Sequence, residues 1–313
     1  MKKILVTGGA GFIGSYLAEK LIQDKDNEVI AVDNLLTGHL KKLPAPASNF
    51  RFIKADVNNR KELSEIMMSH RFDYVFHYAA VVGVELTIQK PVLVLNDLEG
   101  LKNIVELSKN TGVKRIFYSS SSEIYGEPVE FPQHEDTTPL NSRLPYAIVK
   151  NAGEAFLKAY QQEFGLDYTI FRFFNTFGPK QSKNFVISRF MLLAMTNQDI
   201  TIYGDGNQFR TFCYVDDNID ATLSAFYNDL AINDVVNIGG DKEVTIQELA
   251  ELIKKLTRSN SNIVHLSPLA EGDMHGRCPD IDKMKQLLPR ERISLEEGLQ
   301  RIIKEGLFEF NQI

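Results

Sequence analysis

The chain of 313 residues is long for one compact core, so one large domain with a smaller lobe is expected. Its hydrophobic content of 43% is ordinary for a globular protein, and its net charge of −6 argues against a nucleic-acid-binding surface. Cys213 and Cys278 lie far apart in no CxxC pattern, and no apolar run approaches the length that spans a bilayer. The sequence therefore indicates no disulfide framework, no metal site and no membrane segment, and a cytoplasmic location is expected.

The first predicted strand, at residues 4–6, runs directly into the segment TGGAGFIG at residues 7–14 and then into a helix near residues 15–23. In such a turn Gly8 lets the chain leave the strand sharply, Gly11 lets the backbone approach a pyrophosphate, and Gly14 lets the helix pack close to the sheet. Unpaired N–H groups at the helix start would hold the anion. A second strand, at residues 28–32, ends in Asp33, where a carboxylate accepts hydrogen bonds from a ribose diol. The segment therefore predicts a dinucleotide site; the alternative is an ordinary turn with a surface aspartate.

Strands and helices alternate through the first half of the chain. Further strands are predicted at residues 50–54, 74–77, 115–118 and 168–173, and further helices near residues 60–68, 91–110 and 146–164. This alternation predicts an α/β fold with a Rossmann-type doubly wound parallel sheet over residues 1–175, whose ligands bind beyond the carboxyl ends of the strands. After residue 175 the pattern is less regular, with strands at 200–203, 235–238 and 263–266 and helices near 217–228, 245–257 and 294–305. A smaller mixed α/β substrate lobe is expected at residues 176–313, with the region 205–238 partly returning to the first domain.

Tyr146 and Lys150 lie four residues apart in a helix-forming segment, so their side chains share one face. A lysine ammonium favours the phenolate and lowers the pKa of a nearby tyrosine, so Tyr146 is a candidate base for a substrate hydroxyl. Such a pair also occurs in helices by chance. Its position behind a dinucleotide turn favours the catalytic interpretation.

The strand predicted at residues 115–118 leads into four serines, Ser119 to Ser122, and then Glu123. Because strand carboxyl ends in such a sheet face the ligand, these hydroxyls are candidates to contact a substrate alcohol or the nicotinamide end of the cofactor. The alternative is a capped, solvated turn.

Together these motifs resemble the extended short-chain dehydrogenase/reductases of the NAD-dependent nucleotide-sugar epimerase/dehydratase/decarboxylase family. The resemblance covers nearly the whole chain. It rests on TGGAGFIG, on HYAA at residues 77–80, on SSSSEIYG at residues 119–126, on the Tyr146 and Lys150 pair, and on the segments 174–179, 203–206 and 210–217.

The resemblance implies a tightly bound NAD and a nucleoside-diphosphate sugar, most simply a UDP-sugar. The residues implied to hold NAD are Gly8, Gly11, Phe12, Ile13, Gly14, Asp33, Asn34, Asp56, Val57, Ala79, Ala80, Ser119 and Lys150. Those implied to hold the substrate are Val82, Asn175, Arg210 and Arg277, with Arg210 neutralising the diphosphate. NAD is expected over NADP because Asp33 would repel a 2′-phosphate. His77 is interpreted as a buried strand-end histidine.

By the same resemblance, Tyr146 takes the C4 hydroxyl proton while the C4 hydride passes to NAD, Lys150 tunes Tyr146, and Ser121 or Ser122 is the hydroxyl partner. A homodimer is implied, through helices near residues 91–110 and 146–164. No partner that is a nucleic acid or a membrane is expected.

The identity of residue 123, a glutamate, helps to indicate which reaction follows the formation of the 4-keto sugar intermediate. Dehydratases and UDP-glucuronate decarboxylases of the family carry a glutamate there, whereas plain 4-epimerases usually do not; Glu123 otherwise only hydrogen-bonds the sugar or caps Tyr125. The segment at residues 277–281 resembles the decarboxylases, and the one at 178–182 resembles dehydratases of N-acetylated amino sugars. Ala270 stands where many 4-epimerases place a phosphate-binding arginine.

The preferred hypothesis is a 4,6-dehydratase or a UDP-glucuronate-type decarboxylase with Glu123 as second-step base. The alternative is a UDP-glucose or UDP-N-acetylglucosamine 4-epimerase, and the remote one is a non-catalytic dinucleotide sensor.

Overall fold

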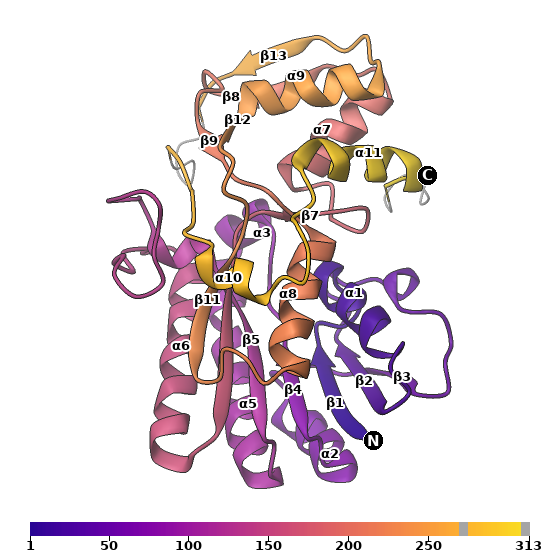
Figure 1. Cartoon of the computed structure of the whole chain (residues 1–313), viewed down its shortest axis with the longest axis vertical. Helices are drawn as coiled ribbons and strands as arrows, with labels where there is room; N and C mark the ends of the chain where they lie inside the picture. Colours follow the sequence, from indigo (N-terminus) through magenta and orange to yellow (C-terminus); the bar gives the residue numbers. More distant parts are fainter. Residues whose placement is uncertain (269–274, 308–313) are drawn as a thin grey trace. The chain divides into compact units, whose positions relative to one another are not determined.

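The computed structural model describes residues 1–268 and 275–307 of the chain (Figure 1). Contacts divide the chain into two compact units. Unit 1 consists of Met1–Ile124, Ser142–Arg172 and Ala225–Val236, and unit 2 of Tyr125–Asn141, Phe173–Ser224 and Asn237–Ile313. Helix α8 (Val215–Tyr227) and strand β11 (Asp234–Ile238) each contribute residues to both units. The Ala270 position lies outside the described residues.

The centre of unit 1 is a seven-stranded sheet with the order β11-β6-β5-β4-β1-β2-β3. Besides β11, its strands are β1 (Lys2–Thr7), β2 (Asn27–Asp33), β3 (Phe50–Lys54), β4 (Tyr74–His77), β5 (Arg115–Ser121) and β6 (Asp167–Phe173). The pairs β1–β2, β2–β3, β1–β4 and β4–β5 are parallel, and the strand order reverses between β1 and β4. The predicted α/β fold with a doubly wound sheet is confirmed. The strand predicted at residues 235–238, in the region expected to return partly to the first domain, corresponds to β11, the edge strand of this sheet.

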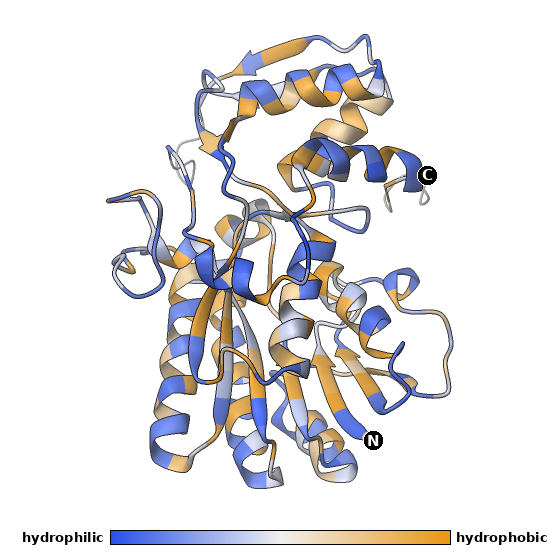
Figure 2. Cartoon of the chain, viewed as in Figure 1, coloured by the Kyte–Doolittle hydropathy of each residue, from blue (hydrophilic) through white to orange (hydrophobic). Residues whose placement is uncertain are grey.

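The sheet is buried on both faces, which explains its nearly continuous apolar strands (Figure 2). On one face, Val75, Ile116 and Ile170 pack in a core with residues of α2 (Arg60–His70), α5 (Asp97–Thr111) and α6 (Pro145–Phe164). On the other face, Phe76 and Phe117 stack on each other and meet the edge of Phe226, at the end of α8. Successive side chains along each strand thus point to opposite faces of the sheet and pack against different layers of helices.

The backbone conformation at particular residues determines where the long helices end. α5 and α6 both end at a glycine in the left-handed conformation, Gly112 and Gly165, as helix C-termini often do. The helix expected near residues 91–110 is divided at Asn96 into α4 (Pro91–Leu95) and α5, and α3 (Val84–Gln89) precedes it. α1 (Phe12–Leu21) follows the glycine turn directly.

Among its described residues, unit 2 contains three two-stranded sheets. They pair β7 (Thr176–Phe177) with β10 (Cys213–Tyr214), β8 (Ile200–Tyr203) with β13 (Ile263–Leu266), and β9 (Phe209–Arg210) with β12 (Val244–Thr245). Its helices are α7 (Val186–Met195), α9 (Ile246–Thr257), α10 (Asp282–Leu287) and α11 (Leu295–Glu305), together with the first part of α8. α9 begins with a capping box of Thr245 and Glu248. A short 3-10 turn of unit 1 lies at Leu40–Lys42. A second one, Ser122–Tyr125, begins in unit 1 and ends in unit 2.

In the described part of the chain, no helix has both the length and the apolar sequence that crossing a membrane requires. Across the same residues, no group of three or more His, Cys, Asp or Glu side chains is arranged to hold a metal ion.

Candidate active site

The turn between β1 and α1 forms a cradle that only glycines fit. Gly8 has a φ of +69°, and a Cβ built on it would lie 2.7 Å from the Ala79 nitrogen. A Cβ on Gly14 would overlap the Gly8 carbonyl oxygen. Gly11 precedes α1 and offers no side-chain cap, so the first N–H groups of the helix, from Phe12 onward, point out of the helix end without a capping oxygen. This arrangement fits a pyrophosphate, which would accept hydrogen bonds from those N–H groups.

The carboxylate of Asp33 lies at the end of β2, next to this turn. It is buried and accepts hydrogen bonds from the backbone nitrogens of Ala10 (3.0 Å) and Leu35 (2.8 Å). Burial raises the pKa of Asp33, while these hydrogen bonds and the charge of Lys42 oppose the rise. The predicted ribose-binding group is therefore anchored to the same turn that would hold the pyrophosphate.

Asn34 and Asp56 meet across the ends of β2 and β3. The Asn34 Nδ2 donates to the Asp56 Oδ2 (3.1 Å), and the Asn58 backbone nitrogen donates to the Asp56 Oδ1 (2.9 Å). The following residue, Val57, packs against the core of unit 1. These three predicted cofactor residues lie together at one edge of the sheet.

The sheet register aligns Thr7 of β1 with His77 of β4, and His77 with Tyr118 of β5. The Thr7 hydroxyl lies 2.8 Å from the His77 Nδ1 and accepts from the backbone nitrogen of Ala79 (3.2 Å), which fixes the start of the Ala79-Ala80 segment. Burial, with a smaller effect from the charge of Lys150, lowers the pKa of His77 to about 3. His77 is thus neutral, and it is buried at the end of a strand, as the sequence predicted. Val82, farther along this segment, is exposed.

Tyr146 and Lys150 lie in the first two turns of α6. Lys150 is 3% exposed, and its Nζ donates to the Ser119 carbonyl oxygen (2.5 Å) and lies 3.3 Å from the Ser119 Oγ. The Nζ is 5.8 Å from the centre of the Tyr146 ring and 5.0 Å from that of Tyr118. Burial lowers the pKa of Lys150 from 10.5 to about 8, against the opposing charge of Asp97. A cation is therefore held beside the Tyr146 ring at neutral pH.

Sequence reasoning missed Asp97, which lies in the first turn of α5. Its Oδ2 accepts from the Val81 backbone nitrogen (2.6 Å), and its charge favours the protonated form of Lys150. It therefore helps to fix the segment after β4 and to keep Lys150 charged. Its helix-start position in the sequence is explained equally well by a favourable helix dipole, so no local signal distinguishes it.

β5 extends three residues beyond its predicted end, so Ser119, Ser120 and Ser121 lie on the strand and Ser122 begins the following 3-10 turn. All four serines are buried, and the Ser119 Oγ donates to the His77 carbonyl oxygen (3.3 Å). The Ser121 Oγ accepts from the Glu123 backbone nitrogen (3.1 Å), so Ser121 caps the 3-10 turn that carries Ser122 and Glu123. Glu123 is half-buried. Unit 1 thus brings a phenol, a cation, hydroxyls and a carboxylate to the carboxyl ends of β4 and β5 and the start of α6.

Unit 2 gathers the predicted substrate residues Asn175, Arg210 and Arg277. Asn175 has a left-handed φ of 36°, and its Nδ2 donates to the Thr211 carbonyl oxygen (2.8 Å), next to Arg210. The Phe209 nitrogen donates to the His275 carbonyl oxygen (3.1 Å), and the Phe209 ring lies against Gly276. Hydrogen bonds between these segments therefore place both arginines and the asparagine in neighbouring stretches of chain.

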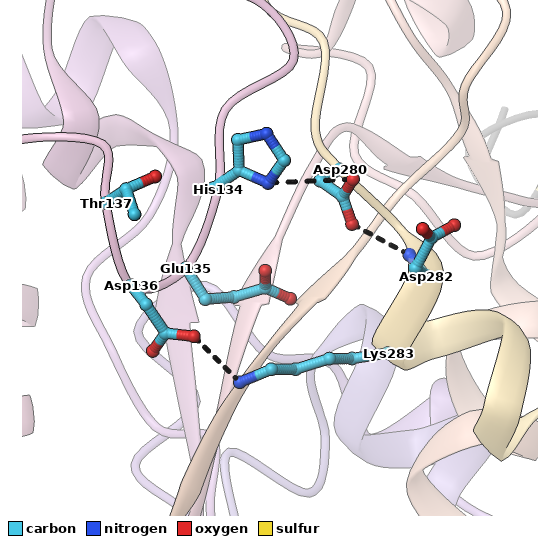
Figure 3. A pocket seen from close by; sticks show the side chains of 7 residues that line it. All are labelled: His134, Glu135, Asp136, Thr137, Asp280, Asp282 and Lys283. Carbon is cyan, nitrogen blue, oxygen red and sulfur yellow. Dashed lines mark hydrogen bonds and ion pairs between the residues drawn. The ribbon is translucent and has the colours of Figure 1, made fainter.

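A cavity of about 420 Å³ in unit 2 contains none of the predicted site residues. It is lined by His134, Glu135, Asp136, Thr137, Asp280, Asp282 and Lys283 (Figure 3). Its charged groups pair with one another: Lys283 lies 3.4 Å from Asp136, and His134 lies 3.6 Å from Asp280. These pairs join the loop of residues 134–137 to the start of α10, and a structural role accounts for them.

Comparison with known proteins agrees with this geometry. A model of the NAD dependent epimerase/dehydratase family matches residues 4–239. The chain is 36% identical to a UDP-N-acetyl-alpha-D-glucosaminuronate decarboxylase of Bacillus cytotoxicus, over 97% of each chain. It is also 36% identical to UDP-glucuronic acid decarboxylase 1 of Danio rerio, over 97% of this chain and 72% of that one. A UDP-glucose 4-epimerase of Thermotoga maritima, solved with UDP-glucose, superposes with a TM-score of 0.91 at 34% identity, covering 99% of this chain and 100% of that one.

The predicted resemblance is confirmed, and with it NAD as the cofactor. The glycine cradle and the anchored Asp33 fit that cofactor on physical grounds alone. The chain is an enzyme that belongs to the NAD-dependent epimerase/dehydratase family.

Proposed function

We propose that the chain oxidises C4 of a UDP-hexuronate and releases the C6 carboxylate as carbon dioxide. In this proposal unit 1 holds NAD through the Gly8–Gly14 turn, Asp33 and Asp56. Unit 2 holds the diphosphate and the sugar carboxylate through Asn175, Arg210 and Arg277. NAD, when bound, supplies the acceptor for the C4 hydride and later returns that hydride.

The first step needs a base for the C4 hydroxyl proton. Tyr146 is suited to this because the Lys150 ammonium, fixed by Ser119, lies close to its ring and favours the phenolate. Ser121 or Ser122 orients the hydroxyl from the end of β5. The proton that Tyr146 takes is returned to the C4 oxygen when the hydride comes back, so the whole reaction is redox-neutral.

The second step depends on C6. A carboxylate at C6 is β to the C4 ketone, so the bond between C5 and C6 breaks with its electron pair delocalised onto the ketone oxygen. Carbon dioxide leaves, and C5 must then receive a proton. Glu123, half-buried at the end of β5, is proposed to deliver it. In a 4,6-dehydratase, the same carboxylate would instead remove the C5 proton as a base.

The observation that carries the choice of a decarboxylase is the arrangement of two arginines in unit 2. Arg277 is buried, and its segment is hydrogen-bonded to the strand of Arg210. A diphosphate and a C6 carboxylate are two separate anions, and two guanidinium groups match that demand. The decarboxylase activities named for two relatives at 36% identity support the same choice.

A 4-epimerase is the second candidate. It is favoured by the similarity to the Thermotoga maritima UDP-glucose 4-epimerase over 99% of the chain. An epimerase returns the hydride to the other face of C4 and needs no proton exchange at C5. It therefore leaves Glu123 without a chemical role.

Mass spectrometry of the products from a panel of nucleotide sugars, with proton NMR to assign the configuration at C4, tests the proposal. The panel contains UDP-glucuronate, UDP-N-acetylglucosaminuronate, UDP-glucose, UDP-N-acetylglucosamine and dTDP-glucose, with a Tyr146→Phe variant as the inactive control. Loss of carbon dioxide from a uronate supports the proposal. Loss of water, or a product of unchanged mass with inverted C4, would replace it with the dehydratase or the epimerase.

We also propose a homodimer in the cytoplasm. Its supporting observation is a set of exposed apolar side chains on α3, α4 and α6 of unit 1: Ile88, Val92, Leu95 and Ile148. Large exposed apolar side chains on adjacent helices are typical of a protein interface.

A further inference from the structure

Glu154 extends the catalytic face of α6 by one turn. Tyr146, Lys150 and Glu154 follow at intervals of four residues, so they share one side of the helix. Lys150 donates to the carbonyl oxygen of Ser119, and Glu154 accepts from the hydroxyl of Ser120 (2.6 Å between Oγ and Oε1). Two successive turns of α6 are thus tied to two successive residues of β5.

Arg172 of β6 fixes the Glu154 carboxylate. Its Nε donates to the Oε1 of Glu154 (3.0 Å) and its Nη2 to the Oε2 (2.7 Å), and both side chains are only 2% exposed. The planar guanidinium holds the carboxylate in a fixed orientation. A buried ion pair is a costly route to stability, because well-packed apolar residues often serve as well. A demand for precise geometry explains the pair better.

The helix and the strand are also unusually close here. A Cβ on Gly153 would overlap the hydroxyl of Tyr118, so α6 lies directly against β5 at this turn. The Lys150 Nζ lies 5.0 Å from the same Tyr118 ring. Apolar contacts are not directional, whereas the hydrogen bond between Glu154 and Ser120 has a preferred geometry and so favours one position of α6 along β5.

We infer that Glu154, fixed by Arg172, is a positioning residue that acts through Ser120 to set where α6 lies along β5. Tyr146 and Lys150 come from α6, and Ser121 and Glu123 follow Ser120 on β5 and its 3-10 turn. The position of one element on the other therefore sets where the Tyr146 base lies relative to the Ser121 hydroxyl, which matters for the first step, and relative to Glu123, which matters for the second. The kinetic consequence of this inference rests on the proposed function.

The variant Ser120→Ala tests the inference, because it removes only the hydroxyl between α6 and β5 and leaves the ion pair of Glu154 and Arg172 intact. A misplacement of about 1 Å lowers a rate by roughly 100-fold. We expect the rate of NAD reduction by bound nucleotide sugar to fall by about 10- to 100-fold, with little change in KM. Ser120→Thr, which restores the hydroxyl, is expected to recover most of the rate.

A matched control lies near the amino ends of β5 and β6, whereas Ser120 lies near the carboxyl end of β5. The buried hydroxyl of Thr169 on β6 accepts from the Arg115 Nε (2.8 Å) and donates to the Ala231 carbonyl oxygen (2.9 Å). Thr169→Ala also removes buried hydrogen bonds of unit 1, but far along the strands from Ser120. It is expected to lower stability and leave the rate of NAD reduction unchanged. Equal rate losses in Ser120→Ala and Thr169→Ala would overturn the inference.

A measurement without substrate separates this inference from the proposed function. The chain contains no tryptophan, so ultraviolet difference spectroscopy records tyrosine ionisation clearly in the NAD-loaded protein. The Tyr146 contribution is the difference between the wild type and Tyr146→Phe. Because Ser119 of β5 holds the Lys150 Nζ while the Tyr146 ring moves with α6, a shift of α6 would draw the ring away from this cation. We therefore expect the pKa of Tyr146 to rise in Ser120→Ala and to stay unchanged in Thr169→Ala.

If no nucleotide sugar is turned over, the proposed function fails while this titration still decides the inference. Identical titrations in the wild type and Ser120→Ala would overturn it. Should Ser120→Ala not fold, Ser120→Cys, a near-isostere with a weak donor, is titrated in its place and is expected to show a smaller rise.

Discussion

At the scale of single residues, the site keeps one buried base neutral and another charged. His77 and Lys150 are both buried, and burial lowers the pKa of each. The pKa of His77 falls to about 3, because burial and, to a smaller extent, the charge of Lys150 both disfavour its protonated form. The pKa of Lys150 falls only to about 8, because the charge of Asp97 offsets part of the lowering that burial causes. The two side chains therefore carry different charges at pH 7 in one small region.

The neutral state of His77 predicts acid sensitivity. Its pKa is about 3 in the folded chain and 6.5 in the unfolded chain, so between these values the unfolded chain binds the extra proton. His77 then lowers the free energy of unfolding by about 1.4 kcal/mol per pH unit as the pH falls from 6.5 toward 3. We expect His77→Asn to lose less stability than the wild type between pH 7 and pH 4.5, measured by urea unfolding. His39→Asn, at an exposed histidine, is the control, and equal acid sensitivity of His77→Asn and the wild type would contradict the assignment.

Glu123 is expected to separate the two halves of the reaction. In Glu123→Gln, the Tyr146 and Lys150 pair remains, so substrate should still reduce bound NAD. The second step should slow by about 100- to 10,000-fold, because a positioned acid or base has been removed. The measurement is NADH absorbance together with product mass in a single turnover. Unchanged product yield would remove Glu123 from the mechanism, and loss of NAD reduction would give it an earlier or structural role.

At the scale of elements, the same residues of the β1–α1 turn shape the fold and are proposed to bind the cofactor. Gly8 permits the positive φ at which the chain leaves β1, and it also lets the backbone of Ala79 on the neighbouring strand end approach. Gly14 accommodates the carbonyl oxygen of Gly8 under the first turn of α1. A side chain at either position would disturb both the packing of α1 and the proposed pyrophosphate cradle.

The variant Gly8→Ala measures this double role. We expect it to lower the free energy of unfolding by about 2–4 kcal/mol, because a positive φ and a close contact with Ala79 both penalise a Cβ. NAD affinity, measured by calorimetry, should fall at least about tenfold, since the cradle is displaced. Gly112→Ala is the control, because it also has a positive φ but nothing within 4 Å of the added Cβ. Equal NAD affinity in the two variants would show that the β1–α1 turn does not contribute to cofactor binding.

The elements that the sequence predicted well are those with a strong local pattern. β3, β4, β8 and β13 have the predicted bounds, and the glycine turn places α1 correctly to within a few residues. β7, β9, β10 and β12 were missed because two residues are too few to show a period. α7 was missed because its sequence, VISRFMLLAM, is apolar on nearly every side and has little polar face.

The candidate site divides in the same way. Gly8, Tyr146 and Lys150 could be proposed from spacing along one turn or one helix, and Asp33 from its place at the end of the second strand. The link from Arg172 through Glu154 to Ser120 could not be predicted, because it joins β6, α6 and β5 and depends on how those elements pack. Asp97 is a similar case, since its meaning depends on Val81 and Lys150.

At the scale of the whole molecule, the chain passes repeatedly between the two units. Residues 225–236 return to unit 1 after a long excursion, and they bring Phe226 against Phe76 and Phe117 and contribute to the edge strand β11. A fragment of residues 1–175 would lack these contacts and expose one aromatic face of the sheet. Unit 1 therefore needs a segment encoded far along the chain to complete its core.

The proposed homodimer gives the last prediction, which concerns the exposed apolar side chains of unit 1. Val92 on α4 is 70% exposed and Ile148 on α6 is 45% exposed, although α4 and α6 pack together. We expect light scattering coupled to size exclusion to show a dimer for the wild type and a monomer for Val92→Glu combined with Ile148→Glu, because burying two carboxylates in an apolar interface is unfavourable. Met68→Glu is the control, since Met68 is 63% exposed on α2, outside the proposed interface. A dimer that persists in the double variant would place the interface elsewhere, and a monomeric wild type would remove it.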